Sequence, residues 1–122
     1  MNAEDVVLAY LYCCGYVFAQ SKQDIIRGLY RVCSKYPDVK AYFDFRVVDN
    51  KVKCEVCSDI IDKLIEKKLA VRDGDKIFLS NYGLKRARYV YSKIPDPLKD
   101  VIVNTVLEVS VYSKKTLKQY FK

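Results

Sequence analysis

Cysteines are the residues of this sequence whose type and spacing first suggest chemistry. Cys54 and Cys57 form a C-x-x-C pair, which is the spacing of metal ligands or of a redox-active dithiol. A zinc site would need a second pair at a matching spacing, and the adjacent Cys13 and Cys14 do not supply it. We therefore interpret Cys54 and Cys57 as a candidate disulfide or thiol pair. Buried free thiols are favoured for all five cysteines, including Cys33, while a structural disulfide, a metal site and redox catalysis remain alternatives.

The residues that most enzymes use are missing or are not arranged for catalysis. The 122-residue chain contains no histidine, which removes the commonest general base and metal ligand. It also lacks a glycine-rich phosphate loop, and no pattern of serine, cysteine or carboxylate residues indicates a nucleophile with its base. We therefore expect that the chain is not an enzyme and that it needs no cofactor.

Positive charge is concentrated in the second half of the sequence. The net charge is +7, from 22 lysines and arginines and 15 aspartates and glutamates. Residues 1–61 hold eight of each sign, so the whole excess lies in residues 62–122. A positive field on one half of a protein favours a polyanionic partner, most often a nucleic acid. A lysine-rich soluble surface without such a partner is the alternative.

No stretch of the sequence is predicted to cross a membrane. The longest apolar run, from Val6 to Phe18, has 13 residues, whereas a helix that spans a bilayer needs roughly 20. The run follows two acidic residues and no basic one, unlike a secretory signal peptide. We therefore expect a cytoplasmic protein.

The organisation of the chain centres on residues 56–83, where an amphipathic helix, a hairpin and the start of another helix follow one another. An apolar stripe that includes Ile61 and Ile65 repeats at helical spacing, and Ser58 is predicted to cap this helix. The Asp-Gly dipeptide at 73–74 lies between two β-prone runs. It predicts a tight hairpin, because glycine accepts a positive φ without a steric penalty.

Five further helices and one strand are predicted around this stretch. The helix at residues 3–19 is apolar nearly all round, so it should lie at the centre of the fold or in a subunit interface. A strand is expected around Tyr42 to Val48, followed by a turn at Asp49-Asn50. The other predicted helices span residues 21–36, capped by Ser21 and ended by Pro37, residues 82–93, capped by Ser80-Asn81, residues 98–111 and residues 113–122.

The order of helix, hairpin and helix carries a family resemblance. Residues 59–87, DIIDKLIEKKLAVRDGDKIFLSNYGLKRA, are similar to an apolar helix, a short wing and an L-T-x-x-G-x-x-x-A segment, which here reads LSNYG followed by Ala87. Residues 43–94 thus resemble the winged-helix pattern of small prokaryotic and archaeal regulators. The C-terminal helices look like those of SocA-type antitoxin-associated domains. The composition, rich in tyrosine and lysine and free of histidine, looks like that of small proteins from archaeal plasmids and viruses.

The resemblance implies a mainly α fold with a small β-sheet. A single domain, residues 1–122, would hold a winged helix-turn-helix core at about residues 20–94, with additional N- and C-terminal helices. The C-terminal helical extension would cover residues 95–122. The strand near Tyr42 to Val48 would then pair with the later hairpin, which would be the wing.

The resemblance also implies a DNA-binding surface. The helix before the wing enters the major groove in such proteins, and the wing contacts phosphate or the minor groove. This places Ser58, Asp59, Asp62, Lys63, Glu66 and Lys67 at the groove. Half of these are acidic, so we expect contacts between basic side chains and phosphates to dominate, with an affinity that falls steeply with salt. The predicted DNA-binding residues are Lys51, Lys53, Ser58, Lys63, Lys67, Arg72, Lys76, Lys85, Arg86 and Arg88.

The leading functional hypothesis is a winged-helix transcriptional regulator that binds double-stranded DNA. We expect a homodimer that forms through the apolar N- and C-terminal helices, because these carry more apolar surface than one small core consumes. The alternative is a protein-interaction module, such as an antitoxin, an adaptor or a viral accessory protein, that uses the same scaffold without reading DNA. The acidic groove-facing residues favour this alternative, and the basic C-terminal half favours DNA binding.

Overall fold

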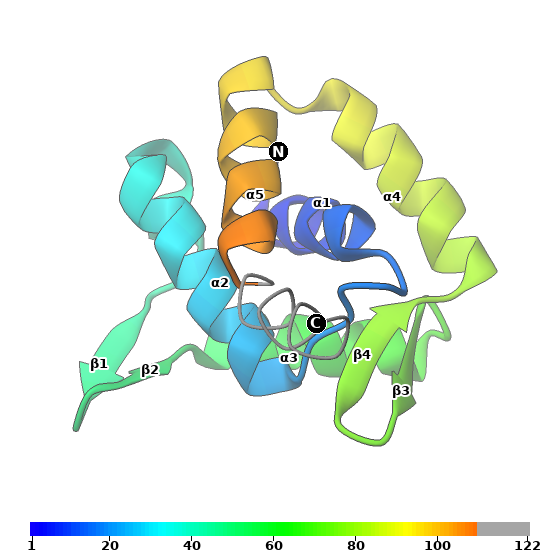
Figure 1. Cartoon of the computed structure of the whole chain (residues 1–122), viewed down its shortest axis with the longest axis horizontal. Coiled ribbons are helices and arrows are strands. Elements are labelled where there is room, and N and C mark those ends of the chain that lie inside the picture. Colours follow the sequence, from blue (N-terminus) through cyan, green and yellow to red (C-terminus); the bar gives the residue numbers. More distant parts are fainter. Residues whose placement is uncertain (110–122) are drawn as a thin grey trace, which may run out of the picture.

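The computed structural model describes residues 1–109, which fold into a mainly helical structure with two short antiparallel hairpins (Figure 1). The predicted mainly α fold with a small β component is confirmed. No helix within these residues is long and apolar enough to cross a bilayer. The helices are α1 (Ala3–Cys14), α2 (Lys22–Lys35), the 3-10 helix η1 (Pro37–Tyr42), α3 (Glu55–Glu66), α4 (Asn81–Lys93) and α5 (Asp96–Val109), and the strands are β1 (Arg46–Val48), β2 (Lys51–Lys53), β3 (Ala70–Asp73) and β4 (Lys76–Leu79).

α1 is the central helix of the fold. Residues 6–11 are each at most 1% exposed, and the helix packs against α3, α4 and α5 (Figure 1). It begins after Asn2, whose side chain accepts a hydrogen bond from the backbone N–H of Asp5 at 2.9 Å. It ends earlier than predicted, at Cys14, because Gly15 takes a left-handed φ of 56°. The sequence predicted that this apolar helix lies either at the centre of the fold or in a subunit interface. In the structure it lies at the centre of the fold.

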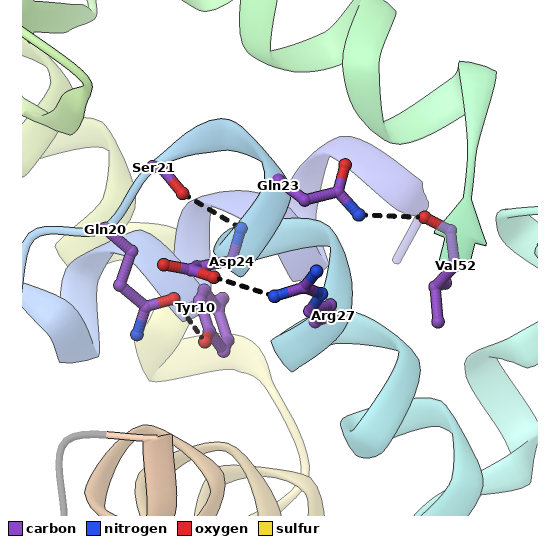
Figure 2. Close-up of polar contacts among 7 residues, drawn as sticks. All are labelled: Tyr10, Gln20, Ser21, Gln23, Asp24, Arg27 and Val52. Atoms are coloured by element: carbon purple, nitrogen blue, oxygen red, sulfur yellow. Dashed lines mark hydrogen bonds and ion pairs between the residues drawn. The ribbon is translucent and has the colours of Figure 1, made fainter. Parts of the chain in front are cut away.

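The start of α2 is joined to α1, as Figure 2 shows, and also to β4. Ser21 caps α2, as predicted, and its Oγ accepts a hydrogen bond from the backbone N–H of Asp24 at 3.2 Å. The preceding residue, Gln20, accepts at Oε1 a hydrogen bond of 2.9 Å from the hydroxyl of the buried Tyr10. Its carbonyl oxygen accepts a second hydrogen bond, of 2.8 Å, from the backbone N–H of Ile77. Gln20 thus forms an isolated antiparallel bridge with β4.

β1 and β2 form a hairpin of their own. The predicted turn at Asp49-Asn50 joins them, and both residues have a positive φ, of 51° and 63°. A two-residue hairpin turn requires such angles, which Asp and Asn tolerate better than most residues. Gln23 of α2 fixes the hairpin by donating from Nε2 to the carbonyl oxygen of Val52 at 3.0 Å (Figure 2). The predicted pairing of this strand with the later hairpin is therefore wrong, because the turn folds β1 back onto the residues that follow it.

α3 begins three residues before the predicted cap. Cys54 is the N-cap residue, and its Sγ accepts a hydrogen bond from the backbone N–H of Cys57 at 3.2 Å. The same thiol donates to the carbonyl oxygen of Phe43 at 2.9 Å. Ser58 lies inside the helix, so its predicted role as the cap is wrong. The predicted apolar stripe faces the core, where Ile61 is fully buried.

The hairpin predicted at residues 73–74 is confirmed as β3 and β4, with a φ of +61° at Gly74. Ser80 then caps α4, as predicted. Its Oγ accepts a hydrogen bond from the backbone N–H of Gly83 at 3.1 Å and donates to the carbonyl oxygen of Lys68 at 2.7 Å. This double role places the first turn of α4 directly beside the end of α3.

α4 and α5 complete the cover of α1. α4 packs against α1, and α5 packs against both α1 and α2. α5 buries Leu98, Ile102 and Val106, which belong to the apolar stripe predicted for the helix at 98–111. The helix predicted at residues 113–122 lies outside the described residues.

Candidate nucleic-acid interface

Seven of the ten predicted DNA-binding residues lie on α3 and the two hairpins that flank it. In Figure 1, α3 runs between the β1–β2 hairpin on one side and the β3–β4 hairpin on the other. All seven side chains are exposed except that of Ser58, which is half-buried. We call this surface the α3 face: Lys51 and Lys53 of β2, Ser58 and Lys63 of α3, Lys67 just after it, Arg72 of β3 and Lys76 of β4.

Both hairpins are held to the helical core close to α3. The β1–β2 hairpin is anchored by the hydrogen bond from Gln23 to Val52, and it leads directly into the Cys54 cap of α3. The β3–β4 hairpin packs against α3 and is tied to the residue before α2 by the bridge between Gln20 and Ile77. The basic side chains of both hairpins are therefore carried on anchored elements rather than on long loops.

The α3 face is nearly neutral as a whole. Residues 44–76 contain eight acidic and eight basic residues, and α3 itself contains four acidic residues and one lysine. One of these acids is paired within the chain, because Lys22 at the start of α2 contacts Asp62 at 2.8 Å. On the β3–β4 hairpin, Asp73 stands directly opposite Lys76. An anion would therefore meet local clusters of positive charge on this face rather than a uniform field.

The other three predicted residues, Lys85, Arg86 and Arg88, lie on α4 and are exposed. α4 starts beside β4 and leads away from α3 along the opposite side of α1 (Figure 1), so the structure does not bring these residues together with the α3 face. Arg86 contacts Glu4 at the start of α1 at 3.7 Å. Lys85 and Arg88 point to solvent without an ion pair among the described residues.

Two tyrosines of α4 were not among the predicted site residues. Tyr82 is 76% exposed and Tyr89 is 67% exposed, although tyrosine is intermediate in burial between apolar and charged residues. Their spacing of seven residues places them on one side of the helix, with Lys85 between them. This spacing was visible in the sequence and could have identified them.

The five cysteines are free thiols, and most of them are buried in the core. Cys54 and Cys57 are buried at the start of α3. Burial raises the pKa of the Cys57 thiol, and the neighbouring thiols of Cys54 and Cys33 raise it further. A raised pKa keeps the thiol protonated, whereas nucleophilic or redox chemistry needs the thiolate. Among residues 1–109, no group of three or more histidine, cysteine or acidic residues is placed to hold a metal ion.

Comparisons give the chain no relatives, since no family model, no curated protein and no solved structure matches it. The order of the elements and the two exposed surfaces, the α3 face and the outer side of α4, are therefore the basis for any functional proposal.

Proposed function

We propose that the chain is a winged-helix DNA-binding protein that acts as a cytoplasmic transcriptional regulator. The observation that carries this proposal is the order of the elements along the chain, together with the isolated β-bridge between Gln20 and Ile77. α1, the bridging residue Gln20, α2, α3, β3 and β4 follow one another as the helices and strands of a winged helix do. Gln20 pairs with Ile77 of β4 in the place of the first strand of such a fold.

This assignment shifts the boundaries of the core that the sequence suggested. α1 becomes the first helix of the winged helix, and η1 with the β1–β2 hairpin becomes an insertion between α2 and α3. The β3–β4 hairpin is the wing. α4 and α5 are then additions that cover the side of α1 left open by the core.

Duplex DNA would lie along the α3 face, with α3 toward the major groove and a hairpin on each side. The pairing of Lys22 with Asp62 supports this placement, because it offsets one acidic charge of α3 and holds a cation at the start of α2. Phosphate contacts would come from the hairpins and from the lysines of α3. The six basic residues of the α3 face are Lys51, Lys53, Lys63, Lys67, Arg72 and Lys76.

Salt dependence of duplex binding tests the proposal. If six cations each contact a phosphate, the affinity for a short random-sequence duplex should fall by roughly 1,000-fold between about 50 mM and 200 mM salt. The variant Lys51→Ala/Lys53→Ala should weaken binding and reduce the slope of log K against log salt by about 1.8. The matched control Lys35→Ala/Lys40→Ala removes the same charge from α2 and η1, away from α3. An affinity that does not change with salt, or equal effects of the two double variants, would refute DNA binding through the α3 face.

A protein-interaction module is the second candidate function, and the charge of α3 favours it. Four acidic residues and one lysine on this helix suit a basic protein partner better than a line of phosphates. An absence of duplex binding at low salt would select this candidate.

In either case we propose a homodimer through α5, where Val103 remains 38% exposed, because α1 is already buried within the chain. Light scattering coupled to size-exclusion chromatography measures this assembly.

A further inference from the structure

The outer side of α4 combines positive charge with exposed aromatic rings. Residues 81–93 include four lysines and arginines and no acidic residue. At 100° per residue, Lys85 lies at the middle of the solvent side, with Tyr82, Arg88 and Tyr89 each within about one turn of it and about 60° around the helix. Gly83 and Ala87 are on the opposite side and are buried. We call this surface the α4 face: Tyr82, Lys85, Arg88, Tyr89 and Lys93.

The two outer tyrosines differ from the third tyrosine of the same helix. Tyr91 is only half exposed, its ring lies 5.1 Å from that of Tyr12, and Lys99 lies over it at 5.2 Å. By contrast, Tyr82 and Tyr89 are two thirds or more exposed. Lys93 lies 5.5 Å from the centre of the Tyr89 ring, which brings a cation to the edge of the α4 face. Core packing therefore accounts for Tyr91 but not for the two outer rings.

We propose that the α4 face binds single-stranded DNA, with bases stacked on Tyr82 and Tyr89 and phosphates near Lys85 and Arg88. Every base has an aromatic face that can stack on tyrosine, and a groove or stripe of cations holds the backbone. The two tyrosines are seven residues apart, which is about 10 Å along the helix. This matches about three nucleotide steps of a stacked strand at 3.4 Å each.

Duplex DNA and acidic peptides fit this surface less well. A duplex keeps its base faces inside the stack, so exposed tyrosine rings have nothing to stack on. An acidic peptide could use the cations but would leave both rings in water. The choice of DNA rather than RNA rests on the proposed function, because base stacking and phosphate contacts are common to both nucleic acids and only a contact to the 2′-hydroxyl distinguishes them.

The α4 face is separate from the α3 face, since α4 leads away from α3 along α1 (Figure 1). A protein with both surfaces could hold a duplex on one side and an unpaired strand on the other. The two activities can therefore be lost independently, and different variants test them.

Fluorescence anisotropy with an oligodeoxythymidine about 20 nucleotides long, which exceeds a typical site of 4–16 nucleotides, tests the proposal. Tyr82→Ala/Tyr89→Ala should weaken binding by about 100-fold, at about tenfold for each lost stacking contact. Tyr82→Phe/Tyr89→Phe keeps the rings and should bind within about twofold of the unmodified chain. Tyr16→Ala, at a tyrosine that is 72% exposed outside α4, is the matched control.

Three results would overturn the proposal: no binding of the oligonucleotide, equal binding by the alanine and phenylalanine variants, or tighter binding of oligouridine than of oligodeoxythymidine. Circular dichroism verifies that each variant is folded before binding is measured. Lys51→Ala/Lys53→Ala should leave oligodeoxythymidine binding intact. If duplex binding fails while the tyrosine-dependent binding is observed, the α3-face proposal falls and the α4-face proposal stands.

Discussion

Mild alkali should destabilise this chain strongly, because its core holds acids that must stay protonated. Cys14 and Cys33 are 2% and 1% exposed, and burial raises the pKa of each thiol to about 12. Burial also raises the pKa of Cys57 and of the Tyr10 hydroxyl. A group whose pKa is higher in the folded than in the unfolded chain contributes full stability below the unfolded pKa. It loses that contribution as the pH rises from the unfolded toward the folded value.

The expected loss of folding stability can be calculated from the thiols of Cys14 and Cys33 alone. In the unfolded chain Cys14 and Cys33 ionise near pH 8.5, whereas in the folded chain they stay protonated to about pH 12. Between about pH 9 and 10.5, each thiol lowers the free energy of unfolding by about 1.4 kcal/mol per pH unit. Over this pH range the two thiols together lower the free energy of unfolding by about 4 kcal/mol. The total stability of a small domain is only about 5–15 kcal/mol.

Urea unfolding in reducing buffer, followed by circular dichroism from about pH 7.5 to 10.5, measures the effect. The free energy of unfolding should fall with a slope that steepens above the thiol pKa of the unfolded chain. Cys14→Ala/Cys33→Ala should be less stable at neutral pH but should show a shallower slope. Tyr16→Phe, at a solvent-exposed ring, should leave the slope unchanged. A free energy that stays constant over this range would refute the argument that the thiols are buried and protonated.

Three substitutions give further expected outcomes. Tyr10→Phe removes the donor to Gln20 and leaves a buried amide oxygen without its partner, so thermal or urea unfolding should show a loss of about 1–3 kcal/mol. Gly83→Ala should cost about 1–3 kcal/mol in the same assay, because a Cβ there would overlap the carbonyl oxygen of Leu69. Gly74→Ala meets no neighbour but must adopt a φ of +61°, so its cost should be about 1 kcal/mol. Equal stability of the Gly83 variant and the unmodified chain would contradict the close packing of α4 on the end of α3.

Elements with strong local signals were predictable from the sequence. Ser21 and Ser80 cap the helices where the sequence placed them, because a serine before an apolar-periodic run satisfies N–H groups of the first turn. The Asp-Gly dipeptide at 73–74 predicted the β3–β4 hairpin for a similarly local reason. These signals need no knowledge of the rest of the chain.

The features that the sequence did not predict depend on unusual or distant partners. Ser58 was the better cap by residue preference, but the thiol of Cys54 performs this role and also donates to the carbonyl oxygen of Phe43, a contact that the sequence does not reveal. The bridge between Gln20 and Ile77 involves one residue on each side, so it leaves no periodic pattern. A single residue pair 57 positions apart becomes visible only in three dimensions.

The candidate site was predictable residue by residue but not as a surface. Most basic residues of the hairpins and α4 were identified and are exposed, but Arg46 of β1 and Lys93 of α4 were not among them. Their division into an α3 face and an α4 face depends on how α4 packs against α1, which charge counts do not reveal. The seven-residue spacing of Tyr82 and Tyr89 was visible in the sequence, but it did not show that both rings are exposed to solvent.

The central position of α1 also has a consequence for how the protein is made. α1 is synthesised before α5, which helps to cover it and which ends at Val109, about 95 residues later. At about 5–20 residues per second, this apolar helix emerges about 5–20 s before its last partner. During that interval it must be shielded by the ribosome, by a chaperone or by provisional contacts with α2 and α3. Truncation within α5 should therefore expose α1 and promote aggregation, although the two segments are at opposite ends of the described sequence.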